Sequence, residues 1–430
     1  MVELVLICVF FALLFIGVPI AFCIGLATVA AMSLSIDWLP AVTTIAQRMA
    51  GGLNSFALLA IPLFILSGQL MSSGGIAQRL ITFARSLVGK LPGGLAYVNV
   101  ISCTLFGAIS GSAVAATSSV GGVMVPAMEE DHYEREFSAA LTATAATTGL
   151  LIPPSNTLIV YAVASGGVSI GALFLGGYLP GLLVALCLMV VCAVYARGRN
   201  LASVQIAEPP PIGKSLVRAG PSLFLIVLVI GGIIAGLFTA TEAGAIAVIY
   251  ALVLSLVYGE IQLGHLPEIL LRASSTTAVV MVLVGTSMAM SWLLAFQNVP
   301  IVVTEALLAI SDNPLVLLLL INIVLLVVGS FMDMTPAVLI FTPIFLPVAT
   351  QLGMSPLHFG IMMVLNLCIG LCTPPVGSVL FVSCAVAKTT IERMIRPLMP
   401  MYVAMIAALL LVTYVPEVSE ALPRAFGLYE

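Results

Sequence analysis

Residues 149–156 read GLLIPPSN, and residues 370–378 read GLCTPPVGS. Each stretch places a Pro-Pro pair inside a long apolar segment, and Pro153 and Pro374 lie 221 positions apart (374 − 153 = 221), about half of the 430 residues. Two further pairs share this offset: Gly149 with Gly370, and Pro126 with Pro347. An internal repeat of this length is typical of duplicated membrane transporters.

The two Pro-Pro pairs predict two broken helices. Proline lacks a backbone donor and its ring clashes with the preceding turn, so neither pair fits an unbroken helix. Within a bilayer, a broken helix is tolerated only where protein or a water-filled cavity satisfies the freed backbone groups. Because the breaks occupy matched positions in the repeat, we expect them to form the walls of a binding site.

The composition is that of a polytopic membrane protein. Hydrophobic residues make up 61% of the chain and charged residues 7%, with a mean hydropathy of +1.24, whereas soluble domains carry about 25% charged residues. No basic segment precedes the first apolar run, so we expect a first membrane span and not a cleaved signal. The eight cysteines lie in apolar runs and are expected to pack as small hydrophobic residues. The histidines, His132, His265 and His358, fall in or beside expected loops and are predicted to be solvated.

The sequence contains no motif of an enzyme or of an ATP-driven pump. It lacks a His-x-x-Glu-His zinc motif, a Gly-x-Ser-x-Gly nucleophile elbow and a Walker loop. The chain is therefore predicted not to be an enzyme and to need no cofactor. Its expected surroundings are the lipid bilayer, and no nucleic-acid partner is expected.

A small polar cluster interrupts the apolar sequence of the first half. Ser110-Gly111-Ser112 joins the apolar segments 91–109 and 114–128, and charged residues flank both outer ends of this pair. Charge at both ends of a folded-back pair predicts a re-entrant hairpin that opens on one side of the membrane.

The second half contains a matching cluster. Residues 329–336, which include Asp333, join the apolar segments 315–328 and 337–348. Asp333 is the only acid in the apolar body of this half, and a carboxylate at membrane depth is costly unless it is paired or binds a cation. It is predicted to be a cation ligand or a proton carrier. The alternative is an acid in a loop that lies nearer the water.

The charge pattern predicts an interfacial helix and an orientation. Apolar residues recur at helical spacing in residues 76–90, with basic residues between them, as in a helix lying in the membrane interface. Placing the polar loop 197–218 in the cytoplasm puts twelve of the fourteen basic residues on that side, in agreement with the positive-inside rule. The two halves are then inverted relative to each other.

The expected chemistry is the binding of ions. Carbonyls and hydroxyls near mid-membrane suit a dehydrated cation, and the N-termini of half-helices attract an anion. Neither polar cluster contains a basic side chain that could pair with an anionic substrate. Serine and threonine also pack membrane helices, so no single hydroxyl decides the question.

Several stretches resemble the large membrane subunit of tripartite ATP-independent periplasmic (TRAP) transporters. The similarity runs essentially end to end, and its motifs are Leu59-Ala60-Ile61-Pro62-Leu63-Phe64-Ile65-Leu66-Ser67-Gly68, Gly74-Gly75-Ile76-Ala77-Gln78-Arg79-Leu80, Ser110-Gly111-Ser112, Ile152-Pro153-Pro154-Ser155 and Thr241-Glu242-Ala243-Gly244-Ala245.

This resemblance implies an all-α polytopic membrane protein, an inverted-repeat elevator transporter with two re-entrant hairpins and two broken helices. It implies sodium-driven uptake of an organic acid across a bacterial or archaeal cytoplasmic membrane. Two partners are implied, a small four-helix TRAP membrane subunit and a periplasmic substrate-binding protein that delivers the acid. Because the chain begins directly at its first span, the small subunit is not expected to be fused to it.

The resemblance also assigns roles to residues of the tips and breaks. Sodium, the only metal expected, would be held by Ser110, Gly111, Ser112, Gly149, Ser155, Asn156, Gly329, Asp333, Thr335, Gly370, Thr373 and Gly377. The substrate would face Thr148, Pro153, Pro154, Pro374, Pro375 and Ser378. Asn156 departs from the family's Ile-Pro-Pro-Ser-Ile pattern, which affects the fine geometry of the first break.

Six regions are expected along the chain. They are 1–90, first-repeat scaffold helices and interfacial arm; 91–168, first-repeat transport unit; 169–218, connecting span and cytoplasmic loop; 219–313, second-repeat scaffold helices and arm; 314–388, second-repeat transport unit; and 389–430, final span and C-terminus.

One alternative satisfies the same physical constraints. A stand-alone ion-coupled dicarboxylate carrier or exchanger would need no delivery protein. A membrane enzyme or a channel fits the sequence less well. The sequence does not name the substrate, because a delivery protein would supply most of the selectivity.

Overall fold

The computed structural model describes residues 2–73, 75–199 and 210–429, and within these residues all regular structure is helical. Eight of the helices are long and apolar enough to cross a membrane. The fold is therefore all-α and polytopic, as the composition predicts. The position of the membrane along these helices, and the assignment of its cytoplasmic side, stay predictions from the sequence.

The described residues of the first half contain ten α-helices and one 3₁₀ helix. Their bounds are α1 Val2–Phe15, α2 Ile20–Met32, α3 Trp38–Leu53, η1 Phe56–Leu59, α4 Ala60–Ser73, α5 Ile76–Val88, α6 Gly94–Ser110, α7 Ala113–Glu130, α8 Arg135–Thr148, α9 Asn156–Ala164 and α10 Ile170–Gly198.

The second half repeats the order of hairpin, broken helix and span. Its α-helices are α11 Ile212–Ile234, α12 Ala240–Val257, α13 Leu266–Phe296, α14 Val299–Leu308, α15 Pro314–Phe331, α16 Met334–Gln351, α17 Pro356–Gly370, α18 Ser378–Ala387, α19 Ile391–Tyr414 and α20 Glu417–Ala425.

Element boundaries reproduce the offset of the repeat. Helix α7 and helix α16 begin 221 positions apart (334 − 113 = 221) and end 221 positions apart (351 − 130 = 221). The spans α10 and α19 also begin at this offset (391 − 170 = 221). The internal repeat is thus present in the order and length of the helices as well as in the sequence.

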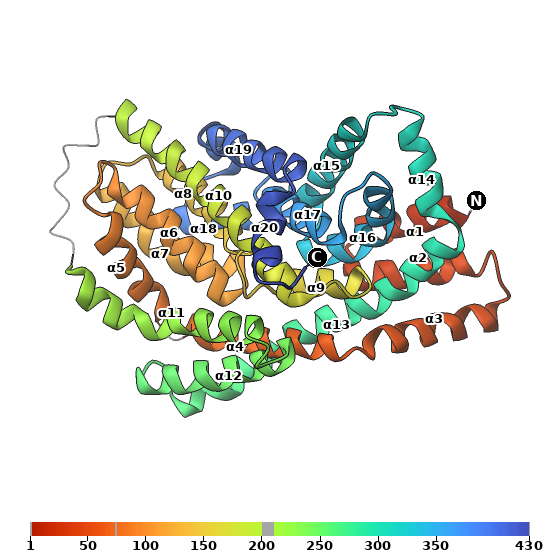
Figure 1. Ribbon diagram of the computed structural model, residues 1–430, viewed down its shortest axis with the longest axis horizontal. Helices are drawn as coiled ribbons and strands as arrows, with labels where there is room; N and C mark the ends of the chain where they lie inside the picture. The colour runs from red at the N-terminus through yellow and green to blue at the C-terminus, as the bar shows by residue number, and fades with distance from the viewer. Residues whose placement is uncertain (1, 74, 200–209, 430) are drawn as a thin grey trace.

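The helices form two groups that lie side by side (Figure 1). Helices α3, α4, α12 and α13 run along one long edge, while α6 to α10 and α15 to α20 fill the other side. The short helices α5 and α14 lie at opposite ends of the molecule. Each bridges the groups, because α5 packs on α6 and α11, and α14 packs on α16 and α13.

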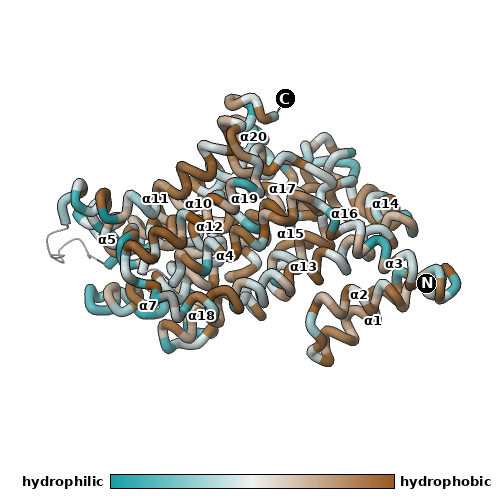
Figure 2. The backbone as a smooth tube through the Cα atoms, turned by 90° about the horizontal axis from the view of Figure 1, so that it is seen from below, coloured by the Kyte–Doolittle hydropathy of each residue, from teal (hydrophilic) through white to brown (hydrophobic). Residues whose placement is uncertain are grey.

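Helix α5 has the predicted amphipathic character. Its apolar residues Ile76, Leu80 and Ala84 are buried against the neighbouring helices, whereas Gln78 is exposed. Figure 2 shows hydrophilic residues around α5 and apolar residues along α10 and α11. Its predicted alignment with the membrane plane stays a prediction.

Each hairpin crosses its broken helix at a pair of glycines. A Cβ added to Gly149 would lie 2.6 Å from the Cα of Gly107, and one added to Gly370 would lie 2.6 Å from the Cα of Gly329. Two helix backbones therefore touch directly at each crossing. Small residues permit such close approach between membrane helices.

The ends of the two halves are also tied by equivalent contacts. Arg199 forms an ion pair with Glu134, and the hydroxyl of Ser355 donates a hydrogen bond to Glu420. The positions correspond at the repeat offset (355 − 134 = 221 and 420 − 199 = 221). The contact is repeated although the residue types differ.

Three expectations from the sequence are wrong in detail. The polar segment 197–218 is not all loop, because α11 already begins at Ile212; residues 200–209 lie outside the described part of the chain. The polar residues Glu260, His265, Glu268 and Arg272 predict a loop before the next span, but helix α13 already begins at Leu266. Its polar first turns carry an ion pair between Glu268 and Arg272 with an N–O distance of 2.5 Å. Ion pairs spaced by four residues stabilise a helix, so polarity alone does not mark a loop.

His358 is the third difference. Its side chain is only 2% exposed, inside α17, and its Nε2 lies 2.6 Å from the carbonyl oxygen of Val412. A tertiary hydrogen bond to a distant helix allows the imidazole to be buried, which the position of His358 beside a predicted loop does not reveal.

The glycine crossing gives a test of the packing. Gly370→Ala should lower the free energy of unfolding by about 1–3 kcal/mol, the usual cost of overpacking, because the new Cβ meets backbone atoms that cannot turn away. Gly231→Ala is the matched control, since Gly231 is an exposed helical glycine with nothing within 4 Å of the added Cβ. Thermal melting in detergent should separate the two variants, and equal melting temperatures would show that the crossing is not tight.

Candidate functional site

The first hairpin turns within two residues. Helix α6 ends at Ser110, Gly111 adopts the left-handed conformation at φ +63°, and Ser112 caps α7 by accepting the N–H of Ala115 at 3.2 Å. A positive φ favours glycine because it has no Cβ. The hydroxyl of Ser110 is buried and donates to the carbonyl of Ser112 at 3.3 Å. The tip is thus a compact cluster of hydroxyl and carbonyl oxygens.

The second tip is built differently. Helix α15 ends at Phe331, Met332 is extended, and the carboxylate of Asp333 caps α16 by accepting the N–H of Met334 at 2.9 Å. Asp333 is exposed in the single chain. A carboxylate that makes one hydrogen bond keeps further lone pairs for another ligand.

Both breaks occur where the Pro-Pro pairs predict them. Helix α8 ends at Thr148 and α9 begins at Asn156, while α17 ends at Gly370 and α18 begins at Ser378. The Pro153–Pro154 and Pro374–Pro375 bonds are both cis. Each break therefore separates two half-helices by several residues of irregular backbone.

The structure brings each tip onto its own break. The carbonyl of Ser330 accepts the N–H groups of Val376 and Gly377, both at 3.3 Å. In the first half, a Cβ added to Gly111 would lie 3.0 Å from Nδ2 of Asn156. Backbone groups freed at the second break are thus satisfied by the second tip.

The two halves meet at the breaks. Oγ1 of Thr147, just before the first break, lies 3.8 Å from Sγ of Cys372 in the second break. Helix α18 packs on α7 and α8, where Ser383 donates to the carbonyl of Ala139 at 2.7 Å. In the equivalent arrangement of the other half, α9 packs on α16 and α17, where Tyr161 donates to the carbonyl of Pro356 at 2.5 Å. The tips and breaks of both halves form one interlocked unit.

The first break contains a buried acceptor that has no partner. Oδ1 of Asn156 is buried and accepts no hydrogen bond within the described residues. An amide oxygen cannot donate, so it requires a donor or a cation. The hydroxyl of Thr117, on α7, is likewise buried without a partner there. These oxygens lie in the half that also carries the first tip.

Most of the other predicted hydroxyls are already donors. Ser155 donates to the carbonyl of Leu150 at 2.5 Å, Thr373 donates to that of Ile369 at 2.7 Å, and Thr148 donates to that of Thr144 at 3.2 Å. Their oxygens retain lone pairs that point away from these bonds. Thr335 and Ser378 are half-buried at the first turns of α16 and α18.

The two breaks differ in exposure. Pro153, Pro154 and Ser155 are buried, whereas Pro375 is exposed and Val376 is 42% exposed in the single chain. The sequence gives no sign of this difference, because both breaks carry the same Pro-Pro pair. In the single chain the second break is therefore the more exposed of the two.

Two further residues contact a tip or a break and are absent from the predicted set. A Cβ added to Gly68 of α4 would lie 2.4 Å from the carbonyl oxygen of Ser110, so α4 touches the first tip directly. The hydroxyl of Tyr402 in α19 donates to the carbonyl of Cys372 in the second break. Gly68 lies within the motif 59–68, which signals its importance but not its contact.

Comparisons with known proteins agree with this architecture. A family model described as the DctM component of the tripartite ATP-independent periplasmic transporter matches residues 7–418. The sialic acid TRAP transporter large permease protein SiaM of Vibrio cholerae is 40% identical over 415 residues, covering 96% of each chain. The C4-dicarboxylate TRAP transporter large permease protein DctM of Pseudomonas aeruginosa is 39% identical over 388 residues, covering 90% of this chain and 91% of that protein.

A solved structure supports the fold. The crystal structure of the Alcanivorax borkumensis YdaH transporter superposes with a TM-score of 0.64 and 17% identity, covering 92% of this chain and 90% of that one. Its identity is low, so it bears on the fold alone. The match of residues 7–418 and the two relatives establish that this chain belongs to the family of TRAP transporter large permease subunits, which are inner-membrane transport proteins and not enzymes.

Proposed function

We propose that this subunit imports an organic acid with a sodium gradient by an elevator movement. It would work with a small membrane subunit and a periplasmic substrate-binding protein. The observation that carries the proposal is the convergence of both hairpin tips and both breaks on one unit, joined at Thr147 and Cys372. Two inverted hairpins over one shared site provide a separate cover for each side of the membrane.

The first sodium ion is proposed to lie between the first tip and the first break. Oδ1 of Asn156 is buried without a partner among the described residues, and Ser110 and Ser112 supply hydroxyl and carbonyl oxygens at the tip that lies against Asn156. Sodium is a hard cation that is bound by such oxygens, and the unwound backbone at a break adds carbonyls. Gly149 and Ser155 would contribute from the break itself.

The second ion is proposed to lie between the second tip and the second break. Asp333 offers a carboxylate that uses one lone pair on Met334, and Thr335 and Thr373 offer hydroxyls nearby in sequence. Carbonyls of Gly329, Gly370 and Gly377 complete the proposed set. A charged ligand here neutralises the cation, whereas the first site contains neutral oxygens.

The substrate is proposed to be a carboxylate held at the half-helix N-termini. Helices α9 and α18 begin at the breaks, and the N-terminus of a helix attracts negative charge. Relatives are described as permeases for sialic acid and for C4-dicarboxylates, both organic acids. The substrate would face Thr148, the prolines of the breaks and Ser378, with the bound sodium ions supplying positive charge.

The moving unit is proposed to include α10 and α19 as well as the hairpins and breaks. Thr413 of α19 accepts a hydrogen bond from Asn322 of α15 at 3.1 Å, and the rings of Phe137 in α8 and Tyr195 in α10 stack at 3.6 Å. A Cβ on Gly177 of α10 would lie 2.3 Å from the carbonyl of Leu151. These contacts attach α10 and α19 to the unit, although the division of the sequence places them in the separate regions 169–218 and 389–430.

The remaining helices would form the scaffold. Helices α1 to α4 and α11 to α13 pack mainly on one another, and α5 and α14 connect them to the moving unit. The scaffold meets the unit where α13 packs on α16 and where Gly68 touches the first tip. An elevator movement would break and remake these contacts while the unit stays intact.

Sodium coupling can be tested in liposomes that contain the complete transporter. Uptake of the organic acid should require an inward sodium gradient and should not respond to ATP, because the site offers oxygen ligands and the sequence lacks a nucleotide-binding loop. Radiolabelled uptake is measured with sodium or potassium outside. Equal uptake in potassium would contradict the proposal.

Asp333→Asn tests the second ion. The change keeps the size of the side chain and removes its charge, so apparent sodium affinity should fall roughly tenfold to a hundredfold, for the loss of about 1.5–3 kcal/mol. Asp312→Asn, in the exposed loop before α15, is the control and should leave sodium dependence unchanged. A wild-type sodium titration in the Asp333 variant would rule out the carboxylate as a ligand.

Gly68→Ala tests the movement of the unit against the scaffold. The added Cβ would clash with the Ser110 carbonyl and disfavour the described state by about 1–3 kcal/mol. The rate of maleimide labelling is measured at Val376→Cys in a Cys8→Ser background, with and without Gly68→Ala. The two rates should differ roughly fivefold or more, and uptake should change as well. Gly231→Ala serves again as the control. Unchanged labelling and uptake would mean that α4 and the first tip do not part during transport.

A further inference from the structure

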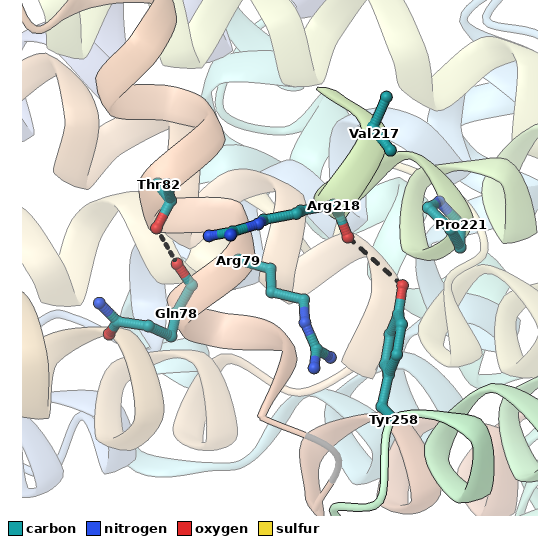
Figure 3. Close-up of a pocket in the computed structure, with 7 residues that line it drawn as sticks. All are labelled: Gln78, Arg79, Thr82, Val217, Arg218, Pro221 and Tyr258. Carbon is teal, nitrogen blue, oxygen red and sulfur yellow. Dashed lines mark hydrogen bonds between the residues drawn. The ribbon is translucent and has the colours of Figure 1, made fainter. Parts of the chain in front are cut away.

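A cavity of about 500 Å³ lies away from the tips and breaks, between the arm α5 and the scaffold. Helix α5 contributes Gln78, Arg79 and Thr82 to one wall (Figure 3). Helix α11 contributes Arg218 to the facing wall, and Tyr258, directly after the end of α12, also lines the cavity. None of the proposed roles of the chain uses this cavity.

The two arginines of the cavity are held in different ways. Arg79 forms an ion pair with Glu260 at 2.5 Å, and its guanidinium lies 3.5 Å from the ring centre of Tyr258. Arg218 takes part in none of the ion pairs found among the described residues. Figure 3 shows its side chain reaching across the cavity towards α5. The described lining residues include no acid, and the carboxylate of Glu260 beside them is paired with Arg79.

The backbone around Arg218 is fixed. The hydroxyl of Tyr258 donates to the carbonyl of Arg218 at 3.3 Å, which ties α11 to the end of α12. Gln78 is exposed on the opposite wall, and the hydroxyl of Thr82 donates to the main-chain carbonyl of Gln78 at 2.7 Å. Arg218 and Gln78 thus line one cavity from two elements, and the side chain of each can donate hydrogen bonds to an anion.

The surface beside the cavity is apolar. Val217 is 76% exposed and Val257 is 75% exposed, and both lie on helices long and apolar enough to span a membrane. Exposed apolar residues of a spanning helix contact acyl chains, whereas arginine and tyrosine gather at the headgroup level. In the predicted orientation this level is the cytoplasmic leaflet, which carries the anionic lipids.

We propose that this cavity binds the phosphate-bearing headgroup of an anionic phospholipid. Arg218 and Gln78 donate hydrogen bonds to the phosphate, and the acyl chains follow the apolar surface at Val217 and Val257. Arginine matches the geometry of a phosphate group, and the apolar flank selects a lipid over a free anion. The lipid would bridge the arm α5 and the scaffold helix α11.

The test counts lipids bound to the purified protein. Protein in nanodiscs of phosphatidylcholine with phosphatidylglycerol is extracted, and retained lipid is measured by native mass spectrometry. Arg218→Ala should lower the retention of phosphatidylglycerol roughly fivefold or more, and Gln78→Ala should lower it by less. Arg197→Ala is the matched control, because Arg197 is an exposed arginine on the same predicted side outside the cavity. Arg218→Lys keeps the charge and should retain part of the binding.

Three results would overturn the proposal. The first is equal retention of phosphatidylglycerol in the wild type and in Arg218→Ala, with both proteins melting at the same temperature. The second is that millimolar inorganic phosphate abolishes the difference in retained phosphatidylglycerol between the wild type and Arg218→Ala, which would assign the cavity to a free anion. The third is loss of assembly with the small membrane subunit at unchanged lipid content, which would assign the cavity to a protein partner.

Discussion

The structure depends on one constraint, the need to satisfy backbone groups freed by proline inside a membrane protein. At the second break the carbonyl of Ser330 accepts two of these N–H groups, and the glycine pairs bring backbone against backbone at both crossings. A hairpin tip must therefore lie on each break. The interlocking of α9 with α16 and of α18 with α7 follows, because each half supplies the surface that covers the other.

The same constraint explains why the chemistry gathers at these positions. Irregular backbone at membrane depth offers carbonyls and N–H groups that a regular helix uses internally. Where the protein does not satisfy all of them, a cation or an anion can take the remaining places. Asn156 adds a side-chain acceptor at the first break, since its Oδ1 is buried at the start of α9 with no partner among the described residues.

Much of the fold could be predicted from local signals. The Pro-Pro pairs mark both breaks, the repeat offset places their partners, and the glycine and serine of the first tip mark a turn. Properties that depend on distant contacts could not be predicted. His358 is buried because Val412, 54 positions away, accepts its hydrogen bond, and Gly68 is required because Ser110 lies against it. The unequal exposure of the two breaks depends on how the halves assemble and not on the Pro-Pro pair that both breaks share.

The ends of the two halves show how a duplicated gene diverges. Position 134 contacts position 199, and position 355 contacts position 420, but an ion pair in the first half is a serine-to-glutamate hydrogen bond in the second. The side that carries the carboxylate has also switched, from the start of α8 to the C-terminal helix α20. At these positions the halves share the place of the contact but not the residues that make it. Residue identity reveals the repeat at the Pro-Pro breaks, whereas at the ends of the halves only the comparison of contacts reveals it.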